Sequence, residues 1–431
     1  DTLDKENRHH QHEIKKDVVD KLIKKMHYLD GYLDDPSYYG KLKDFINKIA
    51  KSSQGKDDVI YYLATYPDLY QSIFENLKNH DLTKEDDGFV RIMVEKPLGN
   101  DYKSASEINA MLDKYFKQSQ IYRLDHYLGK ETIQNILTFR FGNGLFEPLI
   151  NKDHVDHIQI TATEDFGIGA RGGFYDIVGA LKDVGQNHQM QMLAFTTMDA
   201  PSEFTNEAVT KERVKILESL KPDPKKVVFG QYKGYQSEEN VSKGSKTDTF
   251  YAFKTEIEND RFKGVPIYVR AGKNISQTVT EISIVFKTPK NRLFKDLNKG
   301  MEPNVLIYRI QPNEGIVVRF LTKKSGSLEL EENFLQYCYR AQHSTAGHAF
   351  PDPYEKLILD AIKGDQTFFA DAREIESSWK FIDKLIESRN EPEKYEPGTW
   401  GPKSAEDLIK EDGREWLEPS NAFCNISYPI K

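Results

Sequence analysis

Cysteine is scarce in this chain, because only Cys338 and Cys424 occur among 431 residues. Two thiols are far too few for the disulfide framework of a small secreted protein or for a thiolate metal site. Long apolar runs are lacking as well: none approaches the ~20 residues of a membrane span, and the first residues have no signal-peptide core. These absences predict a cytoplasmic protein that does not enter a membrane and holds no metal.

An excess of positive charge is also lacking. Lys and Arg number 60 against 68 Asp and Glu, so the formal net charge is −8. This balance argues against general nucleic-acid binding, which requires a basic face that neutralises phosphates. An anionic substrate must then be captured by local lysines and histidines. With 38% hydrophobic residues, a chain of this length can form two domains with a large buried core.

The first part of the chain has the rhythm of a doubly wound sheet. Apolar runs predict buried strands and 3.6-residue spacing predicts helices in the order strand 59–64, helix 69–77, strand 89–94, helix 105–115 and strand 121–123. Alternation of this kind is typical of parallel α/β sheets. We therefore predict a partial Rossmann-type coenzyme domain over residues 1–123.

The remainder, residues 124–431, is rich in short strand patterns. They fall at 157–163, 249–256, 266–270, 281–286, 304–310, 315–321 and 327–330, with helical patterns at 131–141, 173–195, 353–362, 372–386 and 405–409. Long runs of strands joined by turns predict a mostly antiparallel sheet. The predicted fold class is thus α/β plus α+β, with a partial coenzyme domain followed by a large β-sheet and helix domain.

Residues 123–131 read Arg-Leu-Asp-His-Tyr-Leu-Gly-Lys-Glu and precede the helical pattern at 131–141. His126 and Lys130 are four apart, so at a helix N-terminus both side chains project from one face. Two cations and the phenol of Tyr127 at the positive end of a helix dipole would bind a phosphate monoester dianion. Asp125 would repel that phosphate and should serve another group. The alternative is a solvated polar turn.

This nonapeptide resembles the active-site signature of the glucose-6-phosphate dehydrogenase family, with Leu124 in place of the usual isoleucine. Further blocks are similar to the family in the same order: 91–99 (the EKP-x-G segment), 171–176, 183–188, 269–273, 309–314, 353–360 and 398–402. Such a series in one order does not arise by chance. The resemblance implies a bacterial-type enzyme that oxidises glucose 6-phosphate to 6-phosphoglucono-1,5-lactone in the oxidative pentose phosphate pathway.

The resemblance also implies the partners of the reaction. The cofactor would be NADP, with NAD as an alternative, and the large sheet would serve dimerisation in a homodimer or homotetramer. The sugar hydroxyls would be met by Lys96, Glu164, Asp183, Lys273 and Gln311. Many relatives carry a second basic residue five or six positions after Lys273, where this chain has Thr278 and Val279. Without the family, Asp183 reads equally as a solvated helix carboxylate and Lys273 as a surface lysine.

Oxidation of a hemiacetal hydroxyl requires a base, and His188 is the candidate because imidazole titrates near neutral pH. On a continuous helix from residue 173, Ile177, Leu181, Val184 and His188 form one stripe. A histidine on such a stripe is more often a hydrogen-bonded core residue, and the match to the family's catalytic position is what favours the base. Asp125 would then accept a hydrogen bond from the other ring nitrogen and stabilise the imidazolium.

The glycine-rich opening of a dinucleotide domain does not occur before Val59, although the family carries a G-x-x-G-D-L segment there. A G-x-G-x-x-G pattern at 167–172 is a poor substitute, because no parallel strand is predicted within the ~30 residues that a βαβ unit requires. The remaining cofactor candidates are Pro67, Tyr70 and Lys96. Pro67 and Lys96 follow predicted strands at the carboxyl edge where such sheets bind ligands, whereas Tyr70 could equally lie in the core.

Two other functions are compatible with parts of the sequence. Inositol-type sugar oxidoreductases share a Rossmann domain and an EKP segment but lack the Asp-His-Tyr-Leu-Gly-Lys signature. A catalytically silent homologue that binds sugar phosphates is compatible with the missing glycine-rich turn. On that ground we expect the 431 residues alone to bind glucose 6-phosphate but to turn over poorly.

Overall fold

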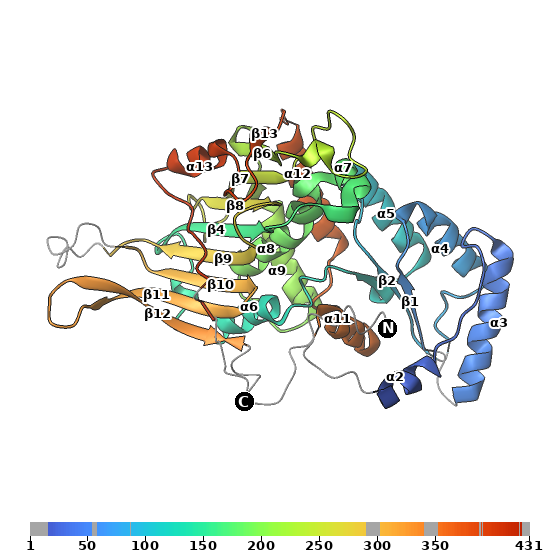
Figure 1. Cartoon of the computed structure of the whole chain (residues 1–431). Coiled ribbons are helices and arrows are strands. Elements are labelled where there is room, and N and C mark those ends of the chain that lie inside the picture. Colours follow the sequence, from blue (N-terminus) through green and yellow to red (C-terminus); the bar gives the residue numbers. More distant parts are fainter. Residues whose placement is uncertain are drawn as a thin grey trace. The chain divides into compact units, whose positions relative to one another are not determined.

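The computed structural model describes residues 16–53, 58–86, 88–289, 302–339, 352–387, 389, 391–421 and 423–424 (Figure 1). The chain divides into two compact units. The first contains the described residues up to Val59 together with Asp68–Val90, and the second contains Ile60–Pro67 and the described residues from Arg91 onward. The domain boundary at residue 123 stays a prediction.

The first unit is helical and contains α2 (Lys16–Ile23), α3 (Pro36–Ser53) and α4 (Tyr70–Asn79). One face of α4 is buried through Tyr70, Ile73, Phe74 and Leu77, which follow helical spacing. Tyr39 of α3 is buried, and its ring stacks on His80 at a centroid distance of 6.1 Å. The helix predicted at 69–77 is confirmed.

A small sheet has the order β1-β2-β3 and consists of β1 (Val59–Leu63), β2 (Val90–Val94) and β3 (Ile121–Arg123). Strands β2 and β3 are parallel, with Ile92 opposite Ile121. Helix α5 (Tyr102–Tyr115) lies between them in sequence and begins with a capping box formed by Asp101 and Ser104. The predicted alternation of strands and helices is confirmed, as is the Rossmann-like character of this region.

The second sheet is much larger. Its strands are β4 (Val155–Thr163), β5 (Leu220–Lys221), β6 (Val227–Tyr232), β7 (Phe250–Ile257), β8 (Ile267–Gly272), β9 (Val279–Phe286), β10 (Val305–Gln311), β11 (Gly315–Lys323), β12 (Leu330–Cys338) and β13 (Glu393–Tyr395). Their order is β12-β11-β10-β9-β4-β8-β7-β6-β13, with β5 beside β7. Only the pairs β4–β8 and β6–β13 are parallel among the described strands of this sheet. The prediction of a mostly antiparallel sheet is confirmed.

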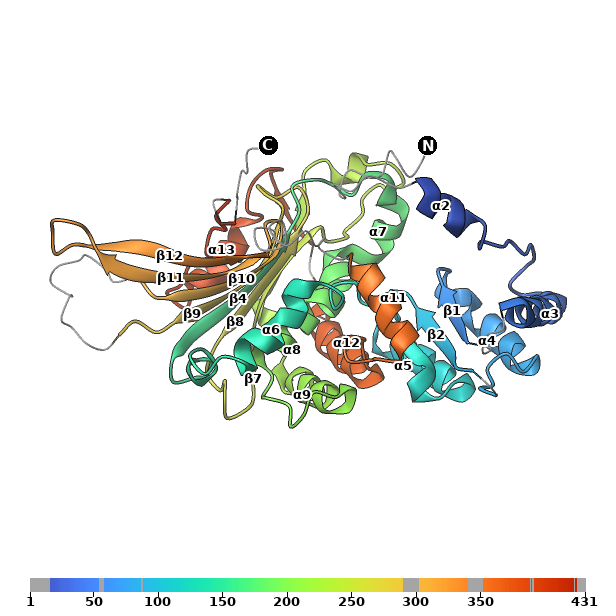
Figure 2. The ribbon, with the colours of Figure 1, turned by 90° about the horizontal axis from the view of Figure 1, so that it is seen from below.

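Helices cover both faces of the large sheet. Figure 2 shows α6 (Glu131–Phe141), α8 (Met190–Thr197) and α9 (Asn206–Glu218) on one side and α13 (Lys403–Lys410) on the other. Every residue of α8 is buried, so this helix lies in the core, as an apolar surface all round requires. The helices predicted near the C-terminus correspond to α11 (Pro353–Lys363), α12 (Ala372–Ile386) and α13.

The helix predicted over residues 173–195 is wrong as a single element. Helix α7 (Gly172–Ala180) is interrupted at Gly179, whose φ of 74° and ψ of 169° are not helical. A π-helical segment, η6 (Leu181–Gln189), follows and continues into α8. Hydrophobic periodicity assumes one helix type throughout, so it could not reveal this change.

The prediction of a strand at 327–330 is also wrong. Residues 327–329 belong to the turn between β11 and β12, and the strand itself runs from Leu330 to Cys338. Most side chains of β12 are exposed or half-buried, so its sequence lacks the apolar alternation that marks a strand with one buried face. Strand β6 and helix α9 were not predicted.

The glycine pattern at 167–172 lies between β4 and α7. A Cβ atom at Gly172 would collide with the carbonyl oxygen of Glu239, and one at Gly167 would come within 3.0 Å of the Glu238 carboxylate. The strand parallel to β4 is β8, which begins only at Ile267. Close packing of a neighbouring loop therefore accounts for Gly167 and Gly172, whereas Gly169 has a positive φ of 53°.

The two cysteines are joined in one disulfide, between Cys338 at the end of β12 and Cys424. One bond is not a framework, but the cysteine count did not predict it. The same C-terminal segment is held by Phe423, which packs in a cluster with Val285 and Val317. The disulfide thus fastens the segment to the outer strands of the large sheet.

Candidate active site

The signature residues 124–130 form consecutive turns between β3 and α6. The N–H groups of Leu128, Gly129 and Lys130 each donate to the carbonyl three residues earlier, at 2.9–3.2 Å. Helix α6 begins only at Glu131, so the prediction that His126 and Lys130 share one face of a helical turn is wrong. The turns nevertheless bring the predicted side chains of this segment together.

Asp125 and His188 form a buried hydrogen-bonded pair. Nδ1 of His188 lies 2.5 Å from Oδ1 of Asp125, and the same carboxylate oxygen accepts the backbone N–H of Tyr127 at 2.9 Å. Both side chains are almost fully buried. This is the geometry in which a carboxylate fixes the tautomer of a general base, as the sequence analysis expected.

The two partners have pKa values suited to that arrangement. Burial alone would raise the pKa of Asp125, but its hydrogen bond with His188, the neighbouring His126 imidazole and the Tyr127 N–H lower it to about 2. Burial lowers the pKa of His188, assisted by Lys96 and opposed by Asp125. At neutral pH the pair is therefore a carboxylate and a neutral imidazole, which can take up a proton.

Lys96 lies on the other side of the imidazole. Its Nζ is 3.1 Å from Nε2 of His188, 3.2 Å from the carbonyl oxygen of Asp183 and 3.4 Å from its Oδ1. Because ammonium can only donate, Nε2 must accept and carries no proton. Lys96, which lies two residues after β2, thus orients Nε2, the basic nitrogen of His188.

The π-helical segment explains why Asp183 and His188 meet at Lys96. On an α-helix, residues five apart point about 140° away from each other, whereas π-helical hydrogen bonds link residues i and i+5 and bring them to one side. The predicted stripe is wrong because the break at Gly179 separates α7 from η6, and Ile177 on α7 is 80% exposed. His188 is buried because of the π-helical segment and not because of α-helical spacing.

Tyr127, Lys130 and Gln311 form a second cluster. Nζ of Lys130 donates to Oε1 of Gln311 at 2.8 Å and lies 5.2 Å from the centre of the Tyr127 ring. Nε2 of Gln311 donates to the Tyr127 hydroxyl at 3.4 Å. The Tyr127 ring also stacks on His188 at 4.1 Å, so this cluster adjoins the acid–histidine pair.

His126 does not act as a second cation in this state, contrary to the sequence analysis. Burial, with the proximity of the His188 imidazole, lowers the pKa of His126 to about 3. Burial also lowers the pKa of Lys130. The positive charge of this cluster therefore comes from Lys130 and not from His126. His126 would become charged only when a bound dianion offsets the cost of burying its charge.

Glu164 and Lys273 form an ion pair. Lys273 is buried, and its carbonyl oxygen accepts a hydrogen bond from the Tyr395 hydroxyl at 2.6 Å. Thr278, which stands where relatives carry a basic residue, donates instead to Asp165 at 2.6 Å. Lys273 is therefore not a solvated surface lysine.

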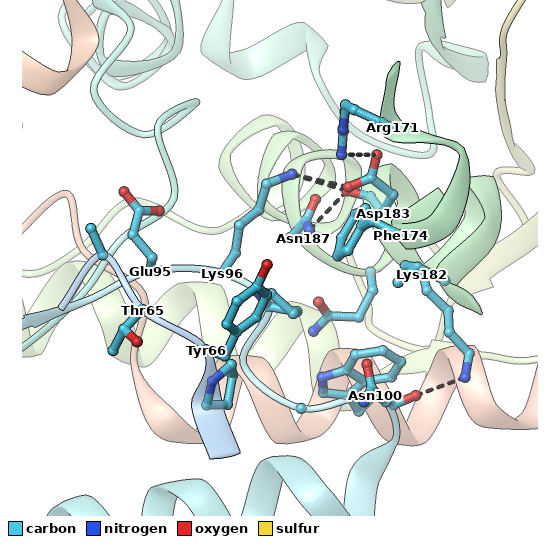
Figure 3. A pocket seen from close by; sticks show the side chains of 17 residues that line it. Thr65, Tyr66, Glu95, Lys96, Asn100, Arg171, Phe174, Lys182, Asp183 and Asn187 are labelled. Carbon is cyan, nitrogen blue, oxygen red and sulfur yellow. Dashed lines mark hydrogen bonds and ion pairs between the residues drawn. The ribbon is translucent and has the colours of Figure 1, made fainter. Parts of the chain in front are cut away.

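A cavity of about 470 Å³ opens beside this centre. Its lining includes Ala64, Thr65, Tyr66, Pro67, Glu95, Lys96, Pro97, Gly99, Asn100, Arg171, Phe174, Val178, Lys182, Asp183, Gln186, Asn187 and Trp379. Figure 3 shows Lys96, Arg171 and Asn187 converging on Asp183. Asp183 is buried, and Lys96 and Arg171 lower its pKa against the opposing effect of burial, so it is an oriented acceptor rather than a solvated carboxylate.

Of the three cofactor candidates, the structure places Pro67 and Lys96 in the cavity wall. Tyr70 belongs to the first unit, where it is buried and its ring lies 5.5 Å from that of Phe74. This is the core position named as its alternative, and a role of Tyr70 beside the cofactor stays a prediction.

Several cavity residues were missed by the sequence analysis. Nη2 of Arg171 lies 3.5 Å from Oδ2 of Asp183, and Arg171 opens a block that had been recognised as a motif. Nζ of Lys182 donates to the Asn100 carbonyl at 2.8 Å. Trp379 comes from α12, and no local pattern could have placed it there.

Asp125, His126 and His188 also have ligand atoms within 4.8 Å of one another, the one such group among the described residues. Two ligands of a tetrahedral zinc ion stand roughly 3.3 Å apart, whereas Asp125 and His188 approach to 2.5 Å. The spacing fits direct proton sharing better than joint metal ligation.

Comparisons with known proteins show which family the chain resembles in sequence. Residues 1–135 match the family model described as glucose-6-phosphate dehydrogenase, NAD binding domain, and residues 137–417 match its C-terminal domain. A glucose-6-phosphate 1-dehydrogenase of Aggregatibacter actinomycetemcomitans is 39% identical, over 94% of this chain and 85% of that protein.

Solved structures show the same relationship. A glucose-6-phosphate 1-dehydrogenase of Mycobacterium avium aligns with a TM-score of 0.83 and 33% identity, over 95% of this chain and 86% of that one. A glucose-6-phosphate dehydrogenase in complex with its substrate glucose 6-phosphate aligns with a TM-score of 0.85 and 32% identity, over 94% and 85%.

Proposed function

Because this chain belongs to the glucose-6-phosphate dehydrogenase family, we propose that it oxidises glucose 6-phosphate to 6-phosphoglucono-1,5-lactone with NADP. This reaction opens the oxidative pentose phosphate pathway. The observation that carries the proposal is the arrangement of Asp125, His188 and Lys96 at 2.5 and 3.1 Å beside the cavity. It supplies an oriented, neutral base next to a space for a sugar and a nicotinamide ring.

His188 takes the proton of the C1 hydroxyl through Nε2, the nitrogen that faces Lys96. Asp125 holds the opposite nitrogen and stabilises the imidazolium that results. Once His188 is protonated, the Lys96 ammonium and the imidazolium repel each other. Lys96 then interacts more favourably with the sugar oxygen that has lost its proton. NADP, when bound, accepts the hydride from C1. Because Lys96 also lines the cavity, it contacts both the sugar and the cofactor in this proposal.

The phosphate of the substrate binds His126, Tyr127 and Lys130. Lys130 supplies a charge-assisted hydrogen bond, and His126 gains a proton as the dianion arrives. The sugar hydroxyls contact Glu164, Asp183, Lys273 and Gln311, an assignment supported by the family resemblance. The two carboxylates among these four are already paired with cations: Glu164 with Lys273, and Asp183 with Lys96.

For the cofactor we assign Pro67, Tyr70 and Lys96. Pro67, Phe174, Val178 and Trp379 give the cavity apolar walls, and Lys182 with Asn100 adds polar groups. A flat ring with a carboxamide substituent fits such a lining. Preference for NADP over NAD stays a prediction.

A homodimer or homotetramer follows from the resemblance. Strand β12 is the edge of the large sheet, and Phe334, Leu335 and Tyr337 on it are exposed. An exposed edge strand with apolar side chains favours pairing with a second copy. Sedimentation of the protein at increasing concentration tests this.

A cytoplasmic location is likewise our proposal. Within the described residues, no helix has the length and hydropathy needed to cross a membrane. The disulfide between Cys338 and Cys424 points the other way, since such bonds are rare in a reducing compartment. Counting free thiols in protein prepared without reductant tests that bond directly.

The competing function is a silent sugar-phosphate-binding homologue. Calorimetric titrations with glucose 6-phosphate and NADP, each alone, should show binding of both, and the mixture should form NADPH faster than glucose with NADP does. Binding of glucose 6-phosphate without any NADPH formation would favour the silent homologue. Neither binding nor turnover would contradict the proposed function altogether.

A further inference from the structure

The polypeptide changes direction at Gly179, between α7 and the π-helical segment η6. Its backbone conformation (φ 74°, ψ 169°) is open to glycine and costly for other residues. A Cβ atom here would also come within 2.7 Å of Oδ1 of Asp248. The break therefore depends on a glycine and on the close approach of one distant carboxylate.

A helix that starts anew leaves its first N–H groups without partners inside the helix. Asp248 accepts two of them: its carbonyl oxygen takes the N–H of Ala180 at 2.9 Å, and its Oδ2 takes the N–H of Leu181 at 2.9 Å. Asp248 lies just before β7, far from η6 in sequence. It caps the segment as an N-cap residue does, but from another part of the fold.

The carboxylate of Asp248 is only 2% exposed, so its charge must be compensated. Nη2 of Arg389 lies 2.5 Å from Oδ1 of Asp248 and also donates to the carbonyl of Lys246 at 3.2 Å. Arg389 remains 26% exposed. The carbonyl oxygen and both carboxylate oxygens of Asp248 thus have partners. Two of these partners, the N–H groups of Ala180 and Leu181, lie at the start of η6.

Asp183 lies two residues beyond Leu181, in the first turn of η6, and His188 lies in the next turn. Both must reach Nζ of Lys96, at 3.4 and 3.1 Å, and displacement of the first turn would move them together. We infer that Asp248, held by Arg389, is a positioning residue that sets η6 so that Asp183 and His188 meet Lys96. The inference rests on the proposed role of His188 as the base.

A purely structural role for Asp248 makes different predictions. Loss of stability would lower the amount of active protein and leave the kinetic constants of the folded fraction unchanged. A positioning role should lower kcat much more than it raises KM for glucose 6-phosphate. Lys130 and Tyr127, which bind the phosphate, come from another segment, and of the proposed sugar contacts only Asp183 moves with η6. A misplacement of reacting groups by about 1 Å can cost roughly 100-fold in rate.

The test uses Asp248→Ala, Asp248→Asn and Arg389→Gln. We expect Asp248→Ala to lower kcat roughly 10–100-fold with KM within about threefold, and Asp248→Asn, which retains an acceptor for the Leu181 N–H, to recover part of the rate. Arg389→Gln should have a smaller effect of the same kind. If Asp248→Ala does not fold, the other two variants decide.

Asp176→Asn is the matched control, because Asp176 lies on α7 before the break. It accepts comparable hydrogen bonds, from the Tyr235 hydroxyl at 2.9 Å and the Ser242 N–H at 3.0 Å. We expect this variant to lower the melting temperature and to leave kcat per folded molecule unchanged. Equal losses of kcat in the Asp176 and Asp248 variants would overturn the positioning role.

A second readout does not require turnover. The groups that face His188 are Asp125 and His126 from the signature turn, Lys96 after β2, and Asp183 on η6. Asp125 raises the pKa of His188 and Lys96 lowers it. Neither residue lies on η6, so displacement of η6 in Asp248→Ala should change that pKa, as measured by histidine NMR titration. An unchanged value would overturn the inference. Absence of NADPH formation by the unaltered protein would refute the proposed function, and this titration would still decide the role of Asp248.

Discussion

The signature turn and the π-helical segment η6 supply the two ends of one site, but they are held in different ways. In the turn, residues 124–130 are tied by hydrogen bonds three residues apart. In η6, the position of His188 depends on Asp125, Lys96 and Asp248, each from a different segment. The proposed phosphate end is thus shaped mainly by its own turn, with Gln311 as a partner from β10, whereas the proposed base end depends on residues from three other segments.

This difference separates binding from chemistry. Substitutions in the Tyr127–Lys130 cluster should act on the affinity for the phosphate, and substitutions around His188 should act on turnover. Each of the following experiments either sharpens that division or breaks it.

His188→Asn should have the largest effect. The amide is close in size but cannot take the C1 proton, and loss of a general base typically costs about 10²–10⁴-fold in rate. Steady-state kinetics should show the loss in kcat, with KM for glucose 6-phosphate nearly unchanged. A variant with normal kcat and raised KM would instead place His188 among the binding residues.

Asp125→Asn should lower kcat by a smaller factor, because the amide can favour the wrong tautomer of His188. Asp125 raises the pKa of His188 against the effect of burial, so its removal lowers that pKa further. The acid limb of the pH profile of kcat/KM should therefore move to lower pH. A limb that moves to higher pH would contradict the proposed pair.

The phosphate end can be tested with Lys130→Ala. Charge-assisted hydrogen bonds contribute on the order of 1.5–3 kcal/mol, so KM for glucose 6-phosphate should rise roughly 10–100-fold. Activity towards unphosphorylated glucose, measured in parallel, is the control and should change much less. Equal losses with both substrates would show that Lys130 supports the fold rather than the phosphate.

Cys338→Ser should have the smallest effect on activity. Loss of a disulfide typically costs about 2–4 kcal/mol of stability, but Cys338 and Cys424 belong to the outer strands and the C-terminal segment, not to the site. Chemical denaturation should show lower stability, while kcat and KM stay within about twofold. A large loss of turnover would mean that the outer strands also determine the position of η6.

The same contrast explains what the sequence could reveal. The turn is a contiguous motif, so Asp125, His126, Tyr127 and Lys130 could be proposed together from the sequence, although the helical spacing expected for them is wrong. Most strands and helices followed from periodicity, which depends on a buried face. The break at Gly179 could not be predicted, because it requires Asp248 and Arg389 to arrive from elsewhere in the chain.

The central claim is that this site oxidises glucose 6-phosphate by giving its C1 proton to His188. The most direct measurement is NADPH formation from glucose 6-phosphate by the unaltered protein and by His188→Asn, with substrate binding measured calorimetrically for both. The account predicts that both proteins bind glucose 6-phosphate and that NADPH formation by His188→Asn is slower than by the unaltered protein by about 10²-fold or more. Comparable NADPH formation by His188→Asn would contradict it.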